Sequence, residues 1–238
     1  MKTFIMIPTY NERENIQILI DKILKLKINN LHVVVVDDNS PDGTASEVQK
    51  ISKSKKNVHL LLRKYKKGRG AAGKAGFIYC LNHGADVIIE MDADMSHDPK
   101  YIPLMINELN NADLILGSRR VKGGSEVGRS PLRRFVTWGA NLYIKLMLGI
   151  KVKDCNSGFR CFKRIVLEKI NLDKIESRGP SIVQEVLFKA HLKGFKIKEI
   201  PITFVNRTKG KSKLGLPQLA AGYYMILKLK INHLLGII

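Results

Sequence analysis

Short apolar runs alternate with stretches of helical spacing through the first half of the 238-residue chain. The runs cover residues 4–7, 32–36, 58–62, 87–91 and 114–117. Runs without polar alternation are typical of strands that are buried on both faces of a sheet. Between the first two runs, apolar residues recur at helical intervals from Ile16 to Leu24. This alternation predicts βαβ units and an α/β fold.

The segment between the third and fourth runs is rich in glycine and lysine. We expect a loop up to Gly73, followed by a helix that ends near Asn82. Four glycines of this segment lie among basic residues and could be taken for a phosphate loop. The GxxxxGK[ST] spacing of such a loop is absent, so the pattern does not predict one.

The pattern of the second half is looser. A loop with three glycines is expected after Arg119, and a long helix is expected at 131–148. Alternating apolar residues at 200–204 predict a late strand. Residues 217–238 form an amphipathic pattern that predicts a terminal helix. No repeat, low-complexity tract or linker divides the chain, so we expect one domain at 1–216 with this helix following it.

Composition and charge narrow the class of protein. With 45% hydrophobic and 26% charged residues, the chain is unlike a disordered or fibrous protein. The net charge is +20, and it is unevenly distributed. Residues 1–118 carry 16 Lys and Arg against 14 Asp and Glu, whereas residues 119–238 carry 25 against 7. The basic half suits a polyanionic partner, either nucleic acid or anionic lipid headgroups.

The cysteines and the first residues of the chain provide information about the cellular compartment of the protein. Cys80, Cys155 and Cys161 form no CxxC pair and have no histidines at zinc spacing, so neither a disulfide framework nor a zinc site is predicted. The first residues do not resemble a cleaved leader. The longest uncharged run covers 14 residues at 214–227, shorter than the about 20 that a membrane span needs. We therefore expect a cytoplasmic protein without a membrane span.

Polar clusters follow three of the predicted strands, at 8–12, 37–44 and 92–94. Each cluster alone could be a capped helix start, because turns need one Asp or Gly. Ligands of open α/β sheets bind outside the carboxyl ends of the strands. Three polar clusters at this one edge therefore predict a ligand site.

Six motifs together resemble glycosyltransferase family 2 enzymes of GT-A fold, and within them the polyprenol monophosphate (dolichyl-phosphate) mannose synthases. The motifs are PTYNERENI at 8–16, VVVDDNSPDGT at 34–44, MDADMSHDP at 91–99, GSR at 117–119, DCNSGFR at 154–160 and FVNRTKGKSKL at 204–214. The first two mark the broad family, and the last three narrow it to polyprenyl-phosphate acceptors. The resemblance covers nearly the whole chain. It implies a Rossmann-like mixed sheet flanked by helices in one catalytic domain.

The resemblance also implies a donor site. Residues of the first two clusters would form the nucleotide pocket; they are Pro8, Tyr10, Glu12, Val36 and Asp38. Asp92, Ala93 and Asp94 would complete it, with the two carboxylates holding Mg²⁺ or Mn²⁺ against the donor diphosphate. Ser96 stands where some relatives have a longer amide, so a weaker or water-mediated metal contact is expected there. Asp98 is expected to cap a helix.

Basic residues are implied to grip the donor and acceptor phosphates, and together with Asp94 they form the expected catalytic set. They are Arg119, Arg133, Arg207 and Lys213, of which Arg119, Arg207 and Lys213 also belong to the donor site. Lys211 replaces the Glu that is usual in relatives. Asp154 suits a turn or a direct role equally well. The glycine-rich segment before Gly73 would be a loop beside the nucleotide.

The implied reaction is inverting transfer of mannose from GDP-mannose to a polyprenyl phosphate. A phosphate monoester is largely dianionic at neutral pH, so no strong general base is required. An alternative is a related transferase that uses UDP-glucose or another nucleotide sugar. A nucleic-acid-binding protein is the competing class, but no helix-turn-helix, RNP or zinc signature is present.

A lipid acceptor implies contact with the cytosolic face of a membrane. Apolar residues of 217–238 lie beside Lys228 and Lys230; they are Leu219, Tyr223, Ile226, Leu227, Leu234 and Ile237. An amphipathic basic helix binds anionic membrane surfaces. The same residues could instead pack on the protein's own core or on a membrane-embedded partner subunit.

Overall fold

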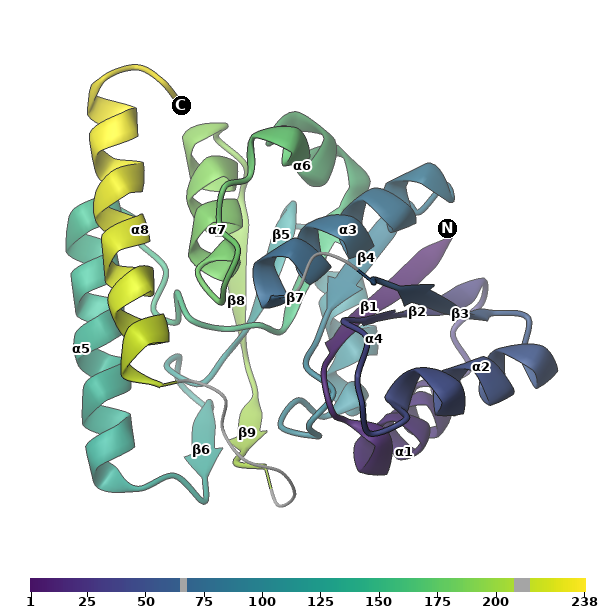
Figure 1. Cartoon of the computed structure of the whole chain (residues 1–238). Coiled ribbons are helices and arrows are strands. Elements are labelled where there is room, and N and C mark those ends of the chain that lie inside the picture. The colour runs from purple at the N-terminus through teal and green to yellow at the C-terminus, as the bar shows by residue number, and fades with distance from the viewer. Residues whose placement is uncertain (65–67, 208–214) are drawn as a thin grey trace.

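The computed structural model describes residues 1–64, 68–207 and 215–238. Within these residues, a seven-stranded sheet has the order β3-β2-β1-β4-β7-β5-β8 (Figure 1). Its strands are β1 (Thr3–Thr9), β2 (Leu31–Asp37), β3 (Val58–Leu62), β4 (Val87–Glu90), β5 (Leu114–Ser118), β7 (Arg160–Lys163) and β8 (Ile197–Pro201). Strand β7 runs antiparallel to both of its neighbours, and the other pairs are parallel. The predicted α/β fold with a mixed sheet is confirmed.

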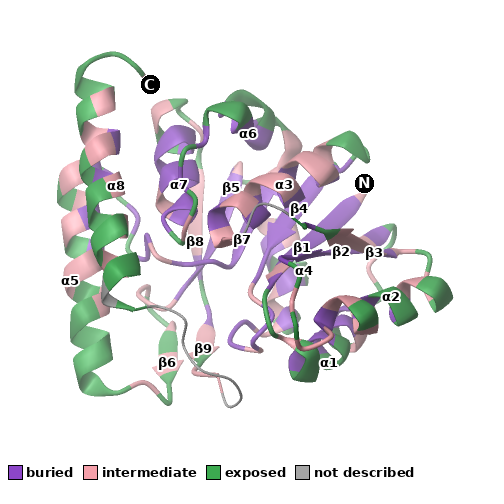
Figure 2. Ribbon diagram, in the orientation of Figure 1, coloured by how far each residue is buried: buried purple, intermediate pink, exposed green. Residues whose placement is uncertain are grey.

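Helices cover both faces of this sheet. They are α1 (Arg13–Leu24), α2 (Thr44–Ser54), α3 (Arg69–Asn82), α4 (Ile102–Glu108), α5 (Pro131–Leu148), α6 (Arg164–Lys169), α7 (Ile182–Leu192) and α8 (Leu216–Leu234), with 3-10 turns η1 (Pro99–Tyr101) and η2 (Leu172–Lys174). Successive residues of a strand point to opposite faces. Ile5 and Val33 therefore pack with α1, α2 and α4, whereas Phe4 and Val34 pack with α3, α6 and α7. Figure 2 shows the buried strands between exposed helix surfaces.

Helices α5 and α8 lie side by side at the β8 side of the molecule (Figure 1). The Tyr143 hydroxyl of α5 donates a hydrogen bond to the Tyr223 carbonyl of α8 at 3.2 Å. Ile144 of α5 and Ile226 of α8 are buried in the same core group as α3 and α7. The described part of the chain also has a parallel pair of short strands, β6 (Ser125–Val127) and β9 (Thr203–Val205). The helix pair thus belongs to the same packed unit as the sheet.

Three local features differ from the expectations. Helix α3 begins at Arg69 instead of after Gly73, because Gly70 lets the helix start pack against the backbone of 177–179. The 200–204 alternation divides at Ile202 into β8 and β9, which pair with different strands. Strand β7 was not expected, since its four residues RCFK form no apolar run. The helix expected at 131–148 coincides with α5.

The three cysteines are free and buried, so the structure contains no disulfide between them. Burial raises the pKa of each thiol, to about 12 for Cys155, where the nearby Asp154 adds to the effect. Among the residues described, no helix combines the length and apolar character that a membrane crossing requires.

Candidate active site

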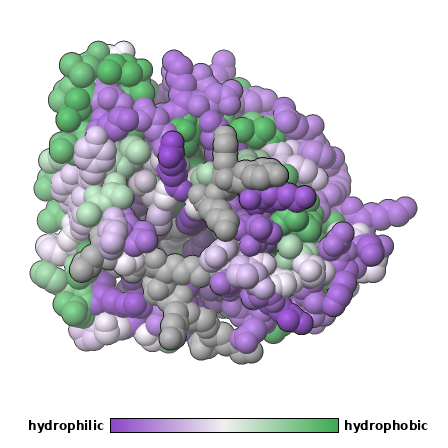
Figure 3. All heavy atoms as spheres, in the orientation of Figure 1, coloured by the Kyte–Doolittle hydropathy of each residue, from purple (hydrophilic) through white to green (hydrophobic). Residues whose placement is uncertain are grey.

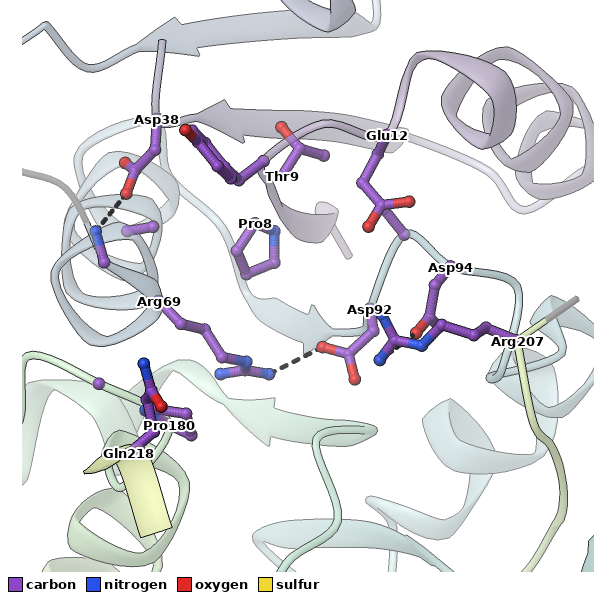
Figure 4. A pocket seen from close by; sticks show the side chains of 15 residues that line it. Pro8, Thr9, Glu12, Asp38, Arg69, Asp92, Asp94, Pro180, Arg207 and Gln218 are labelled. Carbon is purple, nitrogen blue, oxygen red and sulfur yellow. Dashed lines mark hydrogen bonds and ion pairs between the residues drawn. The ribbon is translucent and has the colours of Figure 1, made fainter. Parts of the chain in front are cut away.

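The polar residues that follow β1, β2 and β4 meet at one cavity of about 480 Å³ (Figure 4). Its wall from these strand ends consists of Pro8, Thr9, Tyr10, Glu12, Asp38, Asp92, Ala93 and Asp94. The opposite wall comes from segments distant in sequence; it consists of Gly68, Arg69, Ala72, Gly179, Pro180, Arg207 and Gln218. The parallel pairing of β2, β1 and β4 brings the three clusters together, as predicted.

The two aspartates after β2 have different surroundings. Asp37 is completely buried, and its carboxylate accepts hydrogen bonds from the Thr9 hydroxyl at 2.9 Å and from the Ser40 amide at 2.9 Å. It therefore stabilises the turn. Asp38 lines the cavity and accepts bonds from the guanidinium of Arg63 and the amide of Gly68. Burial raises the pKa of Asp38, and the hydrogen bonds from Gly68 and Arg63 oppose this effect.

Asp92, the first carboxylate of the Asp-x-Asp pair, lies between Arg69 and His97. Arg69 Nη2 donates to its Oδ1 at 2.9 Å, and His97 Nδ1 lies 3.9 Å from its Oδ2. Burial alone would raise the pKa of Asp92, but Arg69 and then His97 outweigh this effect and lower it to about 2. His97 Nδ1 accepts a hydrogen bond from the Asp92 amide at 3.2 Å, and burial lowers the pKa of His97. Asp92 is therefore held as a carboxylate.

Asp94 faces the second arginine of the cavity. Its Oδ2 lies 3.1 Å from Arg207 Nη2, and its Oδ1 accepts a bond from the Ser96 amide at 3.1 Å. The Ser96 hydroxyl is buried and has no partner among the described residues. Asp98 accepts a bond from the Lys100 amide at 3.0 Å and caps η1, as predicted.

The oxygen-rich edge fits a divalent cation. Asp92 keeps 37% of its side chain exposed toward the cavity, and the unpartnered Ser96 hydroxyl adds an oxygen near Asp94. Carboxylates are the ligands that Mg²⁺ and Mn²⁺ prefer, and a bound diphosphate and water supply the remaining positions. Among the residues that the structure describes, no group of three or more His, Cys, Asp and Glu side chains gathers at one point.

A buried ion network lies directly beneath Asp92. Glu90, the last residue of β4, is fully buried and pairs with the equally buried Arg160 of β7, whose Nε donates to it at 2.9 Å. Arg69 Nη1 donates to the other Glu90 oxygen at 3.0 Å. The antiparallel pairing of β4 with β7 places Glu90 opposite Arg160. The strand missing from the expectations therefore supports the site.

A second cavity of about 530 Å³ adjoins the first and shares Arg69, Asp92, Pro180, Arg207 and Gln218 with it. Basic residues at its wall include Arg119, Arg129 and Arg133. Apolar residues of α5 and α8 also line it; they include Leu132, Val136, Ile144, Leu219, Tyr223 and Ile226. The second cavity therefore has both a cationic part and an apolar part.

Arg119 is held in place by Asp154. Its Nε and Nη2 donate to the two Asp154 carboxylate oxygens, each at 2.7 Å, and its guanidinium lies 5.1 Å from the Phe204 ring centre. Glu199 accepts hydrogen bonds from the backbone amides of Lys153 and Asp154. Burial raises the pKa of Asp154, but Arg119 more than offsets this and lowers it. Asp154 therefore acts on the site through Arg119.

Most predicted site residues do lie at the two cavities. Arg207 borders both, and Arg119 and Arg133 border the second. Val36 is the exception, because its side chain is fully buried against Met6 and Gly76 instead of facing the cavity. Lys213, like Lys211, lies outside the described residues.

Several wall residues were not predicted. The sequence predicts Arg69 only as part of a loop beside the nucleotide, and it predicts no site role for Pro180 or Gln218. Arg69 carried a signal, namely a cation between two glycines at the start of a helix. Pro180 and Gln218 carried none, since they reach the cavity only because their segments pack beside it.

Comparisons with known proteins bear on the family of the chain. The sequence profile of glycosyl transferase family 2 matches residues 4–171. An undecaprenyl-phosphate mannosyltransferase of Micrococcus luteus is 40% identical over 215 residues, 90% of this chain and 88% of that protein. A polyprenol monophosphomannose synthase of Mycolicibacterium smegmatis is 39% identical over 217 residues, 90% of this chain and 81% of that protein.

Solved structures share the fold. Glucosyl-3-phosphoglycerate synthase of Mycobacterium tuberculosis, in complex with Mn²⁺, UDP and glucosyl-3-phosphoglycerate, matches with a TM-score of 0.67 at 17% identity. The match covers 98% of this chain and 79% of that one. The fold and the strand-end site define a glycosyltransferase of GT-A type. The chain belongs to glycosyltransferase family 2, whose profile spans well over half of its length.

Proposed function

We propose that this protein transfers mannose from GDP-mannose to a polyprenyl phosphate, with inversion at the anomeric carbon. The observation that carries the proposal is the pair of joined cavities, one lined by carboxylates and the other by arginines and apolar side chains. Relatives at 39 and 40% identity with mannosyltransferase and mannose synthase names support the sugar and the lipid acceptor.

The first cavity suits the nucleotide diphosphate. Asp38 and Glu12 offer hydrogen-bonding oxygens for the base and ribose, and Asp38 lies across the cavity from Asp92 (Figure 4). Asp92 and Asp94 would hold a divalent cation, which neutralises charge on the departing diphosphate. Arg207 adds a guanidinium on the Asp94 side that matches phosphate oxygens. The donor sugar would then point toward the second cavity.

The second cavity suits a lipid phosphate. Arg119, Arg129 and Arg133 supply cationic groups for the phosphate, and the α5 and α8 side chains offer an apolar wall for the first isoprenoid units. Asp154 orients Arg119 by its bidentate contact. Separation of charge from apolar surface along one cavity fits a ligand with a phosphate at one end and hydrocarbon at the other.

The reaction needs positioning more than proton transfer. An acceptor phosphate oxygen forms the new bond to the anomeric carbon, and the bond from that carbon to the diphosphate oxygen breaks with its electron pair. The products are the sugar phosphodiester and a nucleoside diphosphate. Arg119, Arg133 and Arg207 would stabilise the negative charge that both phosphates carry. No side chain has to remove a proton, because the acceptor is already ionised.

Helices α5 and α8 suit a membrane surface. Both helices line the second cavity and also expose large apolar side chains; these are Leu132, Phe135, Trp138, Leu142 and Leu146 on α5 and Tyr224, Leu227, Ile231 and Leu234 on α8. Figure 3 shows hydrophobic atoms along this margin of the molecule. We therefore place the protein on the cytosolic face of a membrane, with α8 at the surface. A membrane-embedded partner subunit on the same helices is the alternative occupant.

The apolar residues of the terminal helix α8, expected to share one role, have different surroundings in the structure. Ile226 is buried in the protein's own core, and Lys228 pairs with Glu176. Leu219 and Tyr223 line the second cavity. Leu227 and Leu234 remain exposed and available to a lipid surface. The helix thus serves the core, the cavity and the exposed face with different residues.

A donor and acceptor panel tests the function. Purified protein is incubated with Mn²⁺ or Mg²⁺, radiolabelled GDP-mannose, UDP-glucose or UDP-galactose, and a short polyprenyl phosphate. We expect labelled lipid from GDP-mannose and a β-linked product from an α-linked donor. Product from UDP-glucose alone would replace the donor assignment with the alternative one. No product with any donor would overturn the proposal.

A further inference from the structure

Arg69 lies where the two cavities meet and has no part in the function described so far. It is the first residue of α3 and lines both cavities, with 23% of its side chain exposed. Its Nη1 donates to Glu90 and its Nη2 donates to Asp92, at 3.0 and 2.9 Å. One guanidinium thus joins a structural carboxylate to a carboxylate of the expected metal site (Figure 4).

The Glu90 end of this contact is fixed. Glu90 is completely buried and is also held by Arg160, so it has no other position to adopt. The helix start is fixed as well, because the Gly70 amide donates to the Arg178 carbonyl at 2.9 Å. Gly158 packs on the guanidinium, and a Cβ there would lie 2.9 Å from Arg69 Nη2. Only the Asp92 end faces open cavity.

The balance of charges around Arg69 would allow its contact with Asp92 to be replaced by a contact with an anion. Glu90 and Asp92 are matched by Arg69 and Arg160 in the structure as it stands. A divalent cation on Asp92 would add two positive charges to this balanced group and would compete with Arg69 for the carboxylate. A buried charge without a partner is strongly destabilising. The excess positive charge therefore favours an anion at the junction of the cavities.

We propose that Arg69 is a phosphate-binding residue whose Nη2 passes from Asp92 to the donor diphosphate when a divalent cation occupies the Asp92 and Asp94 pair. The inference rests on the proposed function and adds a residue to it. Planar guanidinium groups bind phosphate oxygens through short, charge-assisted hydrogen bonds. Because the cation and the diphosphate both act on the same ion pair, each strengthens binding of the other through Arg69.

Binding measurements without turnover test this role. Mn²⁺ binding is followed by electron paramagnetic resonance, and GDP and GMP binding at saturating Mn²⁺ is followed by calorimetry. In Arg69→Gln we expect Mn²⁺ alone to bind at least as tightly as in wild type, because a competing cation is gone. GDP should bind about tenfold more weakly, the value of one lost charged hydrogen bond. GMP should bind as in wild type, since it lacks the second phosphate.

The matched control is Lys74→Gln, which removes a cation from the same helix whose partner Asp173 is 92% exposed. We expect no change in GDP or GMP binding for this variant. Arg69→Lys should recover part of the GDP affinity. Arg69→Lys carries the test, with Lys74→Gln as its control, if melting curves show that Arg69→Gln does not fold.

Two results would overturn the inference. Equal weakening of GDP and GMP would assign Arg69 a structural role, and unchanged GDP binding in Arg69→Gln would exclude a phosphate contact. UDP and UMP replace the guanine pair if the donor panel selects uridine. Wild-type protein that binds no nucleoside diphosphate with Mn²⁺ would count against the proposed function itself. If the wild type binds the nucleoside diphosphate and the Arg69 variants bind it equally well, the role of Arg69 would be contradicted and the proposed function would not.

Discussion

Single residues around the Asp-x-Asp pair divide sharply into those that support the structure and those that face the ligand. Asp37 and Glu90 are buried and satisfied by fixed neighbours. Asp92 and Asp94 have arginine partners and lie at the cavity. Carboxylates of the first kind hold the strand ends in place, and those of the second kind can change partners when a ligand binds.

Asp94→Ala should abolish most metal-dependent turnover, on the order of 10²-fold or more, because it removes one of two expected cation ligands. The fold should persist, since Asp94 lies at a strand end and contributes little to the core. Steady-state rates against Mn²⁺ concentration, with melting curves, provide the measurement. Retained activity with the same Mn²⁺ dependence would contradict the assignment.

Asp98→Ala is the matched control for this variant. It removes the cap of η1 and the hydrogen bond to the Lys100 amide. A lost cap typically costs about 1 kcal/mol of stability. We therefore expect a lower melting temperature with unchanged metal-dependent turnover, the reverse of the Asp94→Ala result.

At the scale of elements, the start of α3 depends on glycine. Gly70 lies against the backbone of the segment that precedes α7, and a Cβ on it would come 2.1 Å from the Ser177 carbonyl oxygen. Backbone cannot move aside as a side chain can. The close contact positions Arg69 and brings Gly179 and Pro180 to the first cavity. The glycine-rich sequence is therefore a packing surface.

Gly70→Ala should lower the free energy of unfolding by about 1–3 kcal/mol, as overpacking does in well-packed cores. Gly139→Ala in α5 is the control, because no atom lies within 4 Å of a Cβ there. Alanine is the better helix former by up to about 1 kcal/mol, so this change should stabilise the protein. Urea denaturation of both variants measures the difference. If Gly70→Ala leaves the free energy of unfolding unchanged, the backbone that contacts the start of α3 can move to accommodate the added methyl group.

Neighbouring strands β2 and β3 carry a histidine pair at the edge away from the active site. His32 Nδ1 lies 3.1 Å from His59 Nε2, and the rings stack at 5.3 Å. Burial, followed by Lys2 for His32 and by His32 for His59, lowers the pKa of both groups. Two imidazoles in such contact share one hydrogen, so at least one must stay neutral.

The unfolding free energy should therefore fall as the pH drops below about 6.5. In this range the unfolded chain, with its ordinary histidine pKa, binds protons that the folded pair resists. Urea denaturation between pH 8 and 5 measures the slope. His59→Gln removes one member of the pair and should flatten it. An unchanged slope in this variant would assign the acid sensitivity to other groups.

At the scale of the whole molecule, charge and apolar exposure coincide. The half of the sequence that follows residue 118 holds most of the net charge, and it includes α5 and α8 with their exposed apolar side chains. Burial of one large apolar side chain contributes about 2 kcal/mol, and each basic group near an anionic surface about 1 kcal/mol. The combination favours an anionic membrane surface.

Vesicle flotation should show binding to anionic liposomes that weakens with salt. Trp138 is the only tryptophan of the sequence and is 52% exposed, so its emission should shift to the blue on binding. Phe135→Ser should reduce binding, whereas Leu104→Ser, on α4, should not. Deleting residues 217–238 is a poorer test, because Ile226 and Leu229 belong to the core. No flotation at low salt would leave a partner subunit as the means of attachment.

Local patterns of the chain were sufficient for the main elements and the place of the site. Continuous apolar runs specify strands buried on both faces, and this burial is what the layered fold then provides. The long helix at 131–148 follows from its 3.6-residue period. The strand-end clusters could be placed together because parallel neighbours end at one edge, which is a rule of topology.

Contacts between segments that are distant in the sequence determined the features that the local patterns did not predict. Val36 and Asp38 are two residues apart, yet one lies in the core and the other at the cavity, because backbone direction changes where β2 ends. Arg69 reaches Asp92 only because Gly70 packs on a segment more than a hundred residues away and Glu90 finds Arg160 on an antiparallel neighbour. Such partners have no local periodicity, since packing of whole elements brings them together.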